Sequence, residues 1–305
     1  MGGELSVRFG VSPIAWINDD LPELGGDTPV ETVLGDAHAL GFEGIELGGK
    51  FPREAVRLGT QLNTHELALI GGWWSAGLLV RTVEEEIEAL QPHLHLLEAL
   101  GSSVFIIAEC SNSIHGNRGR PLSSAPRLPE HQWPAFADRL STLARYLEDR
   151  GLRLAYHFHL GTVVERQADV EQLIAHTEAG VGLVIDTGHA ALGGIDAERL
   201  IRSHPDRVAH VHTKDVRRRI FDEITRRDGS FLDGVLAGMF TAPGDGDLDF
   251  RRIAQALIDI DYAGWVVVEA EQDPALADPR TYGRIGLQTM QRVIGEAAQA
   301  SGAGR

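Results

Sequence analysis

Three apolar runs in the second half of the chain each end in residue types that bind metal ions. They are Val181–Asp186 running into Thr187-Gly188-His189, Val208–His212 running into Thr213-Lys214-Asp215, and Trp265–Glu269 running into Ala270-Glu271-Gln272-Asp273. A continuous Val/Ile/Leu run of this length is typical of a strand buried on both faces, as in a parallel sheet. Carboxylates and imidazoles at the carboxyl ends of several such strands indicate a metal site in a (β/α)8 barrel.

Side chains two residues apart on a strand point the same way, and this parity groups the candidate ligands into layers. The same-face sets are His157 with His159, His210 with His212 and Lys214, and Glu269 with Glu271. Together with Asp186, they gather imidazoles and carboxylates from four successive strands. Two carboxylates and two imidazoles suit Mn²⁺, Co²⁺, Zn²⁺ or Fe²⁺ better than Ca²⁺.

Each of these residues, taken singly, also fits a structural role. A lone His is often only hydrogen-bonded, Asp186 could cap a turn into the next helix, and Glu269 could form an ion pair. Several unpaired charges inside a barrel are costly, however, and one metal ion would neutralise them together. The joint pattern therefore favours a metal site.

The rest of the chain alternates short apolar runs with amphipathic stretches. The expected strands are Phe9–Ala15, Gly44–Leu47, Leu67–Gly71, Val104–Ala108, Leu152–His159, Val181–Asp186, Val208–His212 and Trp265–Glu269. The expected helices are Pro29–Leu40, Arg53–Gln61, Val83–Leu100, Trp133–Arg150, Asp169–Thr177, Asp196–His204, Leu248–Asp259 and Pro279–Ala300. Eight strand–helix units predict a single-domain α/β protein, a (β/α)8 TIM barrel with its core over about residues 8–295. The competing doubly wound sheet lacks its Gly-rich phosphate fingerprint after the first strand.

Two connections are too long for simple turns: Glu109–Gln132 after the fourth strand and Lys214–Gly246 after the seventh. Both leave the carboxyl end of a strand, where barrel active sites are built, so we expect them to shape a pocket or lid. The alternative is a surface excursion or a contact in a homo-oligomer. The loop after the first strand carries Asn18-Asp19-Asp20, which indicates a polyol-binding surface.

Composition narrows the partners. The chain has 28 basic and 44 acidic residues, a formal net charge of −16, which disfavours nucleic acid because phosphate binding needs a cationic surface. The single cysteine, Cys110, cannot form an intramolecular disulfide and fits a reducing cytosol. No stretch approaches the roughly 18 apolar residues of a membrane span, and no signal-peptide pattern is evident. We expect a cytoplasmic protein without a membrane partner.

Other polar residues near strand ends have weaker signals. Trp73 either packs over a ring-shaped substrate or caps the core. Glu46 and Lys50 pair with each other or reach ligand hydroxyls. Glu109 and His115, at the start of the first long connection, are candidate acid/base groups.

In order and spacing, these motifs resemble the xylose-isomerase-like barrel superfamily, which includes sugar isomerases, sugar epimerases and endonuclease-IV-type repair enzymes. Within it, longer strings across residues 8–295 resemble the inosose dehydratase family. The strings are Pro13–Gly26, Glu46–Pro52, Gly71–Ser75, Glu109–Ser111, His115–Gly116, Tyr156–Val164 and Glu269–Pro274.

The superfamily resemblance implies that Asp186, His212 and Glu269 are metal ligands. Its fourth ligand is usually a Glu at the end of strand five, where this chain has His157 and His159. We assign the metal to His157 and a substrate contact to His159, with the reverse assignment as the alternative. The exchange of Glu for His favours Mn²⁺, Co²⁺ or Fe²⁺ over Mg²⁺, with Mn²⁺ or Co²⁺ as the expected metals.

The resemblance also implies an activity: loss of water from the cyclic ketone 2-keto-myo-inositol (scyllo-inosose), giving a trihydroxycyclohexane-dione in myo-inositol catabolism. A divalent ion would stabilise the enolate that forms. The candidate bases are Glu271 and His189, and the groups assisting departure of the hydroxyl are Lys214, Glu109 and His159. The expected substrate contacts are Asn18, Asp19, Lys50, Trp73 and Arg218, the last implied by the related epimerases.

Three other functions remain as alternatives. A cofactor-free ketose epimerase or isomerase would share the metal and the enolate chemistry. A sugar-binding or regulatory barrel would have lost catalysis. A DNA-repair nuclease fits the fold, but the net charge of −16 argues against it.

Overall fold

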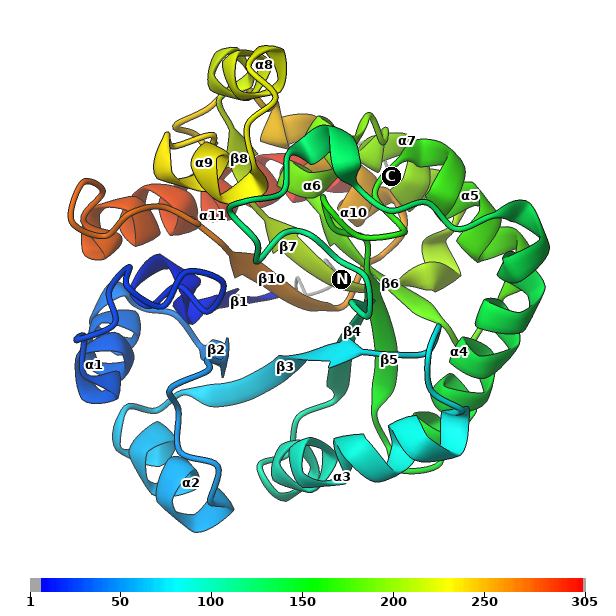
Figure 1. Ribbon diagram of the computed structural model, residues 1–305. Helices are drawn as coiled ribbons and strands as arrows, with labels where there is room; N and C mark the ends of the chain where they lie inside the picture. Colours follow the sequence, from blue (N-terminus) through cyan, green and yellow to red (C-terminus); the bar gives the residue numbers. More distant parts are fainter. Residues whose placement is uncertain (1–6, 304–305) are drawn as a thin grey trace.

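The computed structural model of the protein describes residues 7–303. Its parallel strands close into a barrel in the order β1-β10-β7-β6-β5-β4-β3-β2 (Figure 1). The barrel strands are β1 (Val7–Val11), β2 (Gly44–Leu47), β3 (Ala68–Ala76), β4 (Val104–Glu109), β5 (Arg153–His157), β6 (Gly182–Asp186), β7 (Val208–Thr213) and β10 (Gly264–Val268). The predicted (β/α)8 barrel is confirmed.

Helices surround the strands on the outside, as Figure 1 shows. They are α1 (Val30–Leu40), α2 (Ala55–Thr64), α3 (Val83–Ala99), α4 (Trp133–Glu148), α5 (Gln167–His176), α6 (Thr187–Gly193), α7 (Ala197–Ser203), α8 (Arg218–Arg226), α9 (Phe231–Leu236), α10 (Phe250–Asp259) and α11 (Pro279–Ala303). No helix within residues 7–303 is both long and apolar enough to cross a membrane.

The barrel strands are apolar on both faces because they pack against helices outside and against each other inside. On β4, Phe105 and Ile107 join the large core beneath the helices, whereas Ile106 belongs to a separate apolar cluster inside the barrel. Deeper in the barrel, Trp265 fills the interior. A Cβ atom on Gly44 would lie 2.7 Å from the Trp265 ring, so this position accepts only glycine. The interior is therefore a packed floor beneath the polar strand ends.

Besides β1, which ends at Val11 instead of Ala15 because Pro13–Ala15 form a 3-10 helix, two strand ends differ from the prediction by two residues or more. β3 continues to Ala76 because Trp73 and the residues after it pair with β4, so Trp73 lies within the strand instead of following it. β5 ends at His157, so His159 lies in the connection beyond the strand. These two boundaries decide which side chains face the barrel axis.

Both long connections contain structure of their own. The segment after β4 has two short 3-10 helices, Leu122–Ser124 and Glu130–Gln132, before α4 begins. The segment after β7 contains α8 and α9 (yellow in Figure 1), enclosed by the two-residue strands β8 (Asp215–Val216) and β9 (Phe240–Thr241), which pair antiparallel. The second connection is thus a small subdomain.

Candidate active site

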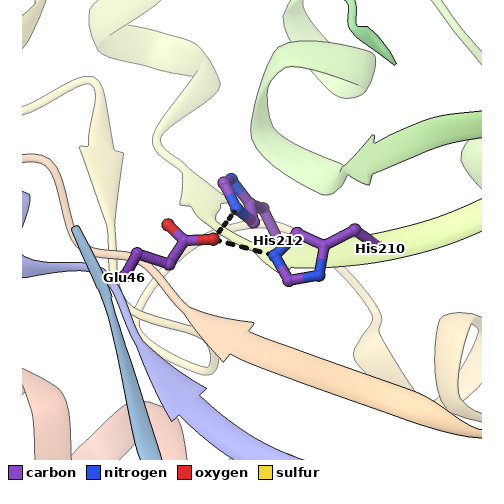
Figure 2. A group of neighbouring side chains, drawn as sticks. All are labelled: Glu46, His210 and His212. Carbon is purple, nitrogen blue, oxygen red and sulfur yellow. Dashed lines mark hydrogen bonds and ion pairs between the residues drawn. The ribbon is translucent and has the colours of Figure 1, made fainter. Parts of the chain in front are cut away.

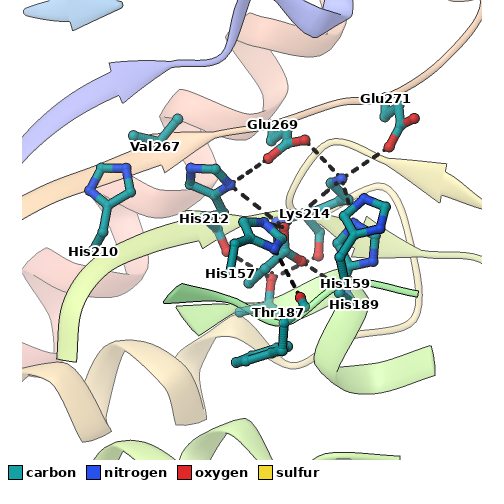
Figure 3. A network of polar contacts seen from close by, with 12 residues as sticks. His157, His159, Thr187, His189, His210, His212, Lys214, Val267, Glu269 and Glu271 are labelled. Atoms are coloured by element: carbon teal, nitrogen blue, oxygen red, sulfur yellow. Dashed lines mark hydrogen bonds and ion pairs between the residues drawn. The ribbon is translucent and has the colours of Figure 1, made fainter. Parts of the chain in front are cut away.

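The carboxyl ends of β5, β6, β7 and β10 bring His157, Asp186, His212 and Glu269 together. Figure 3 shows His157, His212 and Glu269 of this set. Asp186 lies beside His212 in the register of β6 and β7. Asp186 Oδ2 is 3.5 Å from His157 Nε2 and 3.7 Å from His212 Nδ1. Glu269 Oε2 is 2.8 Å from His212 Nδ1. Residues far apart in the chain thus converge on one point, as the strand parity predicts.

The chemistry of these side chains fits a divalent cation. Asp186 Oδ2, His212 Nδ1 and Glu269 Oε2 are buried, and none of the three makes a hydrogen bond. The short contact between His212 and Glu269 is not aligned as a hydrogen bond, although the two atoms are close. Buried polar atoms without partners are costly, and a shared cation is the usual compensation. Three of the side chains, His157, Asp186 and His212, have ligand atoms within 4.8 Å of one another.

Hydrogen bonds to carbonyl groups orient the two histidines of strand five. His157 Nδ1 lies 2.9 Å from the Phe158 carbonyl oxygen, which can only accept a hydrogen bond. The proton is therefore on Nδ1, and the lone pair on Nε2 faces Asp186. His159 makes the same kind of bond to the Leu160 carbonyl, but it lies beyond the end of β5. The centre of its ring is 3.8 Å from the centre of the His189 ring. The structure places His157 beside the other three candidate ligands.

Glu46 on β2 reaches across the barrel to β7, as Figure 2 shows. Its Oε1 atom accepts hydrogen bonds of 2.8 Å from Nε2 of both His210 and His212. With Nε2 of His212 protonated toward this carboxylate, Nδ1 is left as the ligand nitrogen. Burial alone would lower the pKa of His212, but Glu46 and Glu269 hold it well above its usual value. The surrounding carboxylates thus favour a positive charge at this place.

Of the two alternatives for Glu46 and Lys50, pairing with each other is wrong, because Glu46 pairs with His210 and His212. Lys50 is exposed beyond the end of β2, whereas the Glu46 side chain points into the barrel. The alternation of side chains along β2 could have predicted the direction of Glu46. Ile45 and Leu47 belong to the core beneath the helices, which leaves Glu46 on the inner face of the barrel.

Lys214 connects the candidate metal ligands to Glu271 (Figure 3). Its ammonium group is buried, 2.8 Å from Glu269 Oε1, 3.1 Å from Glu271 Oε2 and 3.9 Å from Asp186 Oδ2. Burial would lower the pKa of Lys214, but these carboxylates raise it above its ordinary value. Burial raises the pKa of Glu271, and Lys214 opposes that effect.

A cavity opens above these groups. Its lining combines the strand-end residues with side chains from the first two loops and from β3: Ser12, Pro13, Ile14, Asp19, Asp20, Glu46, Leu47, Trp73, Ile106, His157, His159, His189, His212, Glu269 and Glu271. Four predicted substrate or acid/base residues, Asp19, Trp73, His159 and His189, are therefore brought to the cavity together with Glu271. Asn18 is buried just behind it, with Nδ2 3.5 Å from Glu271 Oε1. Asp20 also lines this space; the sequence placed it in a polyol-binding surface with Asn18 and Asp19 but assigned it no role of its own.

Two other predicted residues lie away from this cavity. Glu109 is buried and accepts hydrogen bonds from the backbone N–H groups of Ser111 and Leu79, because its neighbour Ile106 takes the inner face of β4 and parity turns Glu109 outward. Arg218 begins α8 and lines a separate cavity beside α7 and α10, donating from Nη1 to the Ala191 carbonyl. Pairing of β8 with β9 carries this helix away from the barrel mouth.

A family model described as a xylose isomerase-like TIM barrel matches residues 34–292. The chain belongs to this family. Among its relatives is the rhizopine catabolism protein MocC of Rhizobium meliloti, 43% identical over 293 residues that cover 96% of this chain and 90% of the relative. The inosose dehydratase 2 of Bacillus cereus is 37% identical, covering 96% of this chain and 99% of the relative. The resemblance to inosose dehydratases that the motifs indicate is confirmed.

Solved structures share the fold at lower identity. An L-ribulose 3-epimerase superposes with a TM-score of 0.70 at 16% identity, covering 97% of both chains. The IOLI protein, solved with a bound zinc atom, superposes with a TM-score of 0.68 at 15% identity, covering 95% of this chain and 99% of that one. At such identities the comparison establishes the barrel alone.

Proposed function

We propose that this protein is an inosose dehydratase, a carbon–oxygen hydro-lyase that removes water from 2-keto-myo-inositol to give a trihydroxycyclohexane-dione in myo-inositol catabolism. The observation that carries the proposal is the similarity, over nearly the full length of both chains, to relatives named inosose dehydratase. The cavity supports it chemically, because it combines an aromatic side chain, carboxylates and imidazoles around a site that suits a cation.

In this proposal His157, Asp186, His212 and Glu269 hold a divalent ion, with Mn²⁺ or Co²⁺ as the expected metals. When bound, such an ion stabilises negative charge on the ketone oxygen as a Lewis acid. The donor set of two imidazoles and two carboxylates, three of whose atoms have no hydrogen-bond partner, supports this assignment.

Glu271 is the proposed base that removes the proton beside the carbonyl. Its Oε2 accepts from Lys214 and its Oε1 from Asn18, as expected of an ionised carboxylate. We prefer it to His189, whose two ring nitrogens already face the Leu160 N–H and the Lys214 ammonium, each at 3.2 Å. Lys214 keeps the two neighbouring glutamates ionised beside each other.

The remaining cavity residues bind and orient the substrate in this proposal. Trp73 presents its ring to the cavity from β3, and its indole N–H is engaged with Ser75 Oγ at 2.8 Å, so it offers an apolar face. Asp19 and His159 offer acceptors for the ring hydroxyls. Asn18 acts indirectly, because it holds both Glu271 and the loop that covers the cavity.

The test is an assay of the purified protein with scyllo-inosose, following the absorbance of the diketone product. Elemental analysis first identifies the bound metal; EDTA treatment and add-back of Mn²⁺ or Co²⁺ follow. We expect activity to be lost and then restored, and Glu269→Gln to be inactive with either metal. Full activity after complete metal removal would contradict the metal assignment. An epimerised product without loss of water would replace the dehydratase with a ketose epimerase.

A further inference from the structure

Asp20 lies at the mouth of the cavity, in the loop after β1, and the fold fixes its position from two sides. Asn18 Oδ1 accepts hydrogen bonds from the backbone N–H groups of Asp20, at 2.9 Å, and Leu21, at 2.8 Å. The Leu21 side chain is buried in an apolar cluster that includes Phe231 of α9. The loop is therefore built into the wall of the site, and its Asp20 side chain is only 26% exposed.

The partner of Asp20 comes from the opposite side of the mouth. Nε2 of His115, in the segment after β4, is 3.7 Å from Asp20 Oδ1. His115 is buried, its Nδ1 atom has no hydrogen-bond partner, and its ring lies 4.7 Å from the His159 ring. The Asp20 carboxyl group thus stands between this imidazole and the cavity that it lines together with Glu271.

Dehydration needs two proton transfers, and the proposed function so far supplies one. A hydroxide ion is a poor leaving group, so an acid must protonate the hydroxyl as the C–O bond breaks. Resting on the proposed dehydratase function, we propose that Asp20 is the acid that protonates the departing hydroxyl.

The step balances with the groups already named. Glu271 removes the proton beside the ketone, and the C–H electron pair forms the enolate. As the ketone re-forms, this pair becomes the new C=C bond, the C–O bond breaks toward oxygen, and the hydroxyl takes the Asp20 proton to leave as water. The proton held by Glu271 returns to Asp20 through solvent, and the enol product settles as the diketone.

The other candidate acids are less suited to this step. The Lys214 ammonium is held by Glu269 and Glu271, at 2.8 and 3.1 Å. The N–H of His159 points to the Leu160 carbonyl, so a neutral ring presents only a lone pair to the cavity. Glu109 does not line the cavity.

The charges around Asp20 agree with an acid role. Burial, then the negative charge of Glu271, raise the pKa of Asp20 to about 7; Asp19 and Glu269 add to this effect, and Lys214 opposes it. His115, which faces Asp20 from the segment after β4, is kept neutral near pH 7 because burial lowers its pKa to about 4. About half of the Asp20 carboxyl groups therefore carry a proton at pH 7, which suits a group that gives up and regains a proton in each turnover.

The experiment separates the two proton transfers in the metal-loaded enzyme. Scyllo-inosose is incubated in D2O with wild type, Asp20→Asn, and the control Glu23→Gln, an exposed carboxylate of the same loop. Exchange of the α-hydrogen is followed by NMR, and water loss by diketone absorbance. For Asp20→Asn we expect water loss to fall about 100-fold or more while exchange stays within about threefold of wild type. Glu23→Gln should leave both rates unchanged.

A second substrate distinguishes loss of the acid from small structural changes that Asp20→Asn causes in the active site. This second substrate is an analogue with fluorine in place of the departing hydroxyl. The fluorine leaves as fluoride and needs no protonation, so Asp20→Asn should process this analogue at nearly the wild-type rate. Equal losses of exchange and water loss in Asp20→Asn, or an equal loss on the fluoro analogue, overturn the acid role. A wild-type protein that neither exchanges nor dehydrates scyllo-inosose would instead contradict the proposed function itself.

Discussion

At the scale of single residues, Glu46 determines how His212 presents itself to a metal ion. One carboxylate oxygen accepts hydrogen bonds from Nε2 of His210 and of His212, both at 2.8 Å (Figure 2). Nδ1 of His212, 2.8 Å from Glu269 Oε2, is therefore the nitrogen that faces the proposed metal site. Desolvation of Glu46 would raise its pKa, but His212 and His210 hold it well below its usual value. Glu46 therefore stays ionised and acts as a positioning residue.

Replacing Glu46 with Gln should weaken metal binding. The amide of Gln carries an NH2 group that cannot accept either imidazole N–H, and its single oxygen is a weaker acceptor than a carboxylate. Loss of such a supporting partner typically costs about 10- to 100-fold in metal affinity. We expect this decrease for Mn²⁺ in competition with a chelator, measured without substrate.

The matched control is Glu54→Gln, because Glu54 is exposed just before α2 and makes no side-chain capping bond. Urea unfolding of the metal-free proteins shows whether Glu46→Gln is folded at the temperature used. An unchanged affinity in a folded Glu46→Gln protein would show that His212 does not need this support.

The sequence predicts the metal-binding set better than the substrate-binding set, for a physical reason. Parity along a buried strand defines which face a side chain takes, so the pattern groups His157, Asp186, His212 and Glu269 together with their same-face neighbours, and the family resemblance selects Asp186, His212 and Glu269 among them. Lys50 and Arg218 lie beyond their strands, where no periodicity determines direction. The fold consequently directs both elsewhere. Glu109 also misses the cavity, but it lies within β4, where parity turns it to the outer face.

At the scale of elements, the two long connections hold each other across the mouth of the barrel. Leu122 N donates to the Gly229 carbonyl at 2.9 Å, and Arg118 pairs with Asp233 at 2.9 Å. Asp233 also accepts from the Ser230 N–H at the start of α9, in a capping box. These bonds fix α9 so that Phe231, its first residue, faces the His159 and His189 rings at 5.2 and 6.0 Å.

The length of the second connection was predictable, but its contents were not. Strands of two residues and helices of six or nine residues are too short for a hydrophobic period to define them. Their stability comes from contacts with the other long connection, which no local pattern encodes.

Replacing Phe231 with Leu should impair substrate binding more than it impairs folding. A Leu side chain keeps most of the buried volume, so the free energy of unfolding should fall by only about 1 kcal/mol. The His159 and His189 rings, however, lose the aromatic ring that packs against them. We therefore expect kcat/KM to fall about 10-fold, mainly through KM. Steady-state kinetics with scyllo-inosose and urea unfolding measure the two effects.

The control for this variant is Phe221→Leu, since Phe221 is partly buried on α8 and lines a different cavity. Its KM should match that of wild type. Equal changes in KM for the two variants would mean that Phe231 of α9 does not support the substrate-binding cavity.

At the scale of the whole molecule, the proposed metal ligands come from four strands that are neighbours in the barrel, β10, β7, β6 and β5. Without an ion, the interior holds buried acceptor atoms of Asp186, His212 and Glu269 that lack hydrogen-bond partners. Each such atom costs about 1–3 kcal/mol. The ion would therefore join consecutive strands at the mouth, and its binding free energy would add to the stability of the closed barrel.

Thermal unfolding should accordingly depend on the metal. An ion that binds only the native state, at about 100 times its Kd, adds about 2.7 kcal/mol, and for a domain of about 300 residues this corresponds to an increase in Tm of about 4 °C. Scanning calorimetry in EDTA and in Mn²⁺ measures the difference. The informative variant is Glu269→Gln, because Asp186 also caps α6 by accepting from His189 N at 2.8 Å, so its replacement would destabilise the fold by a second route. In Glu269→Gln the increase should largely disappear; an increase equal to that of wild type would place the ion somewhere other than the ends of these four strands.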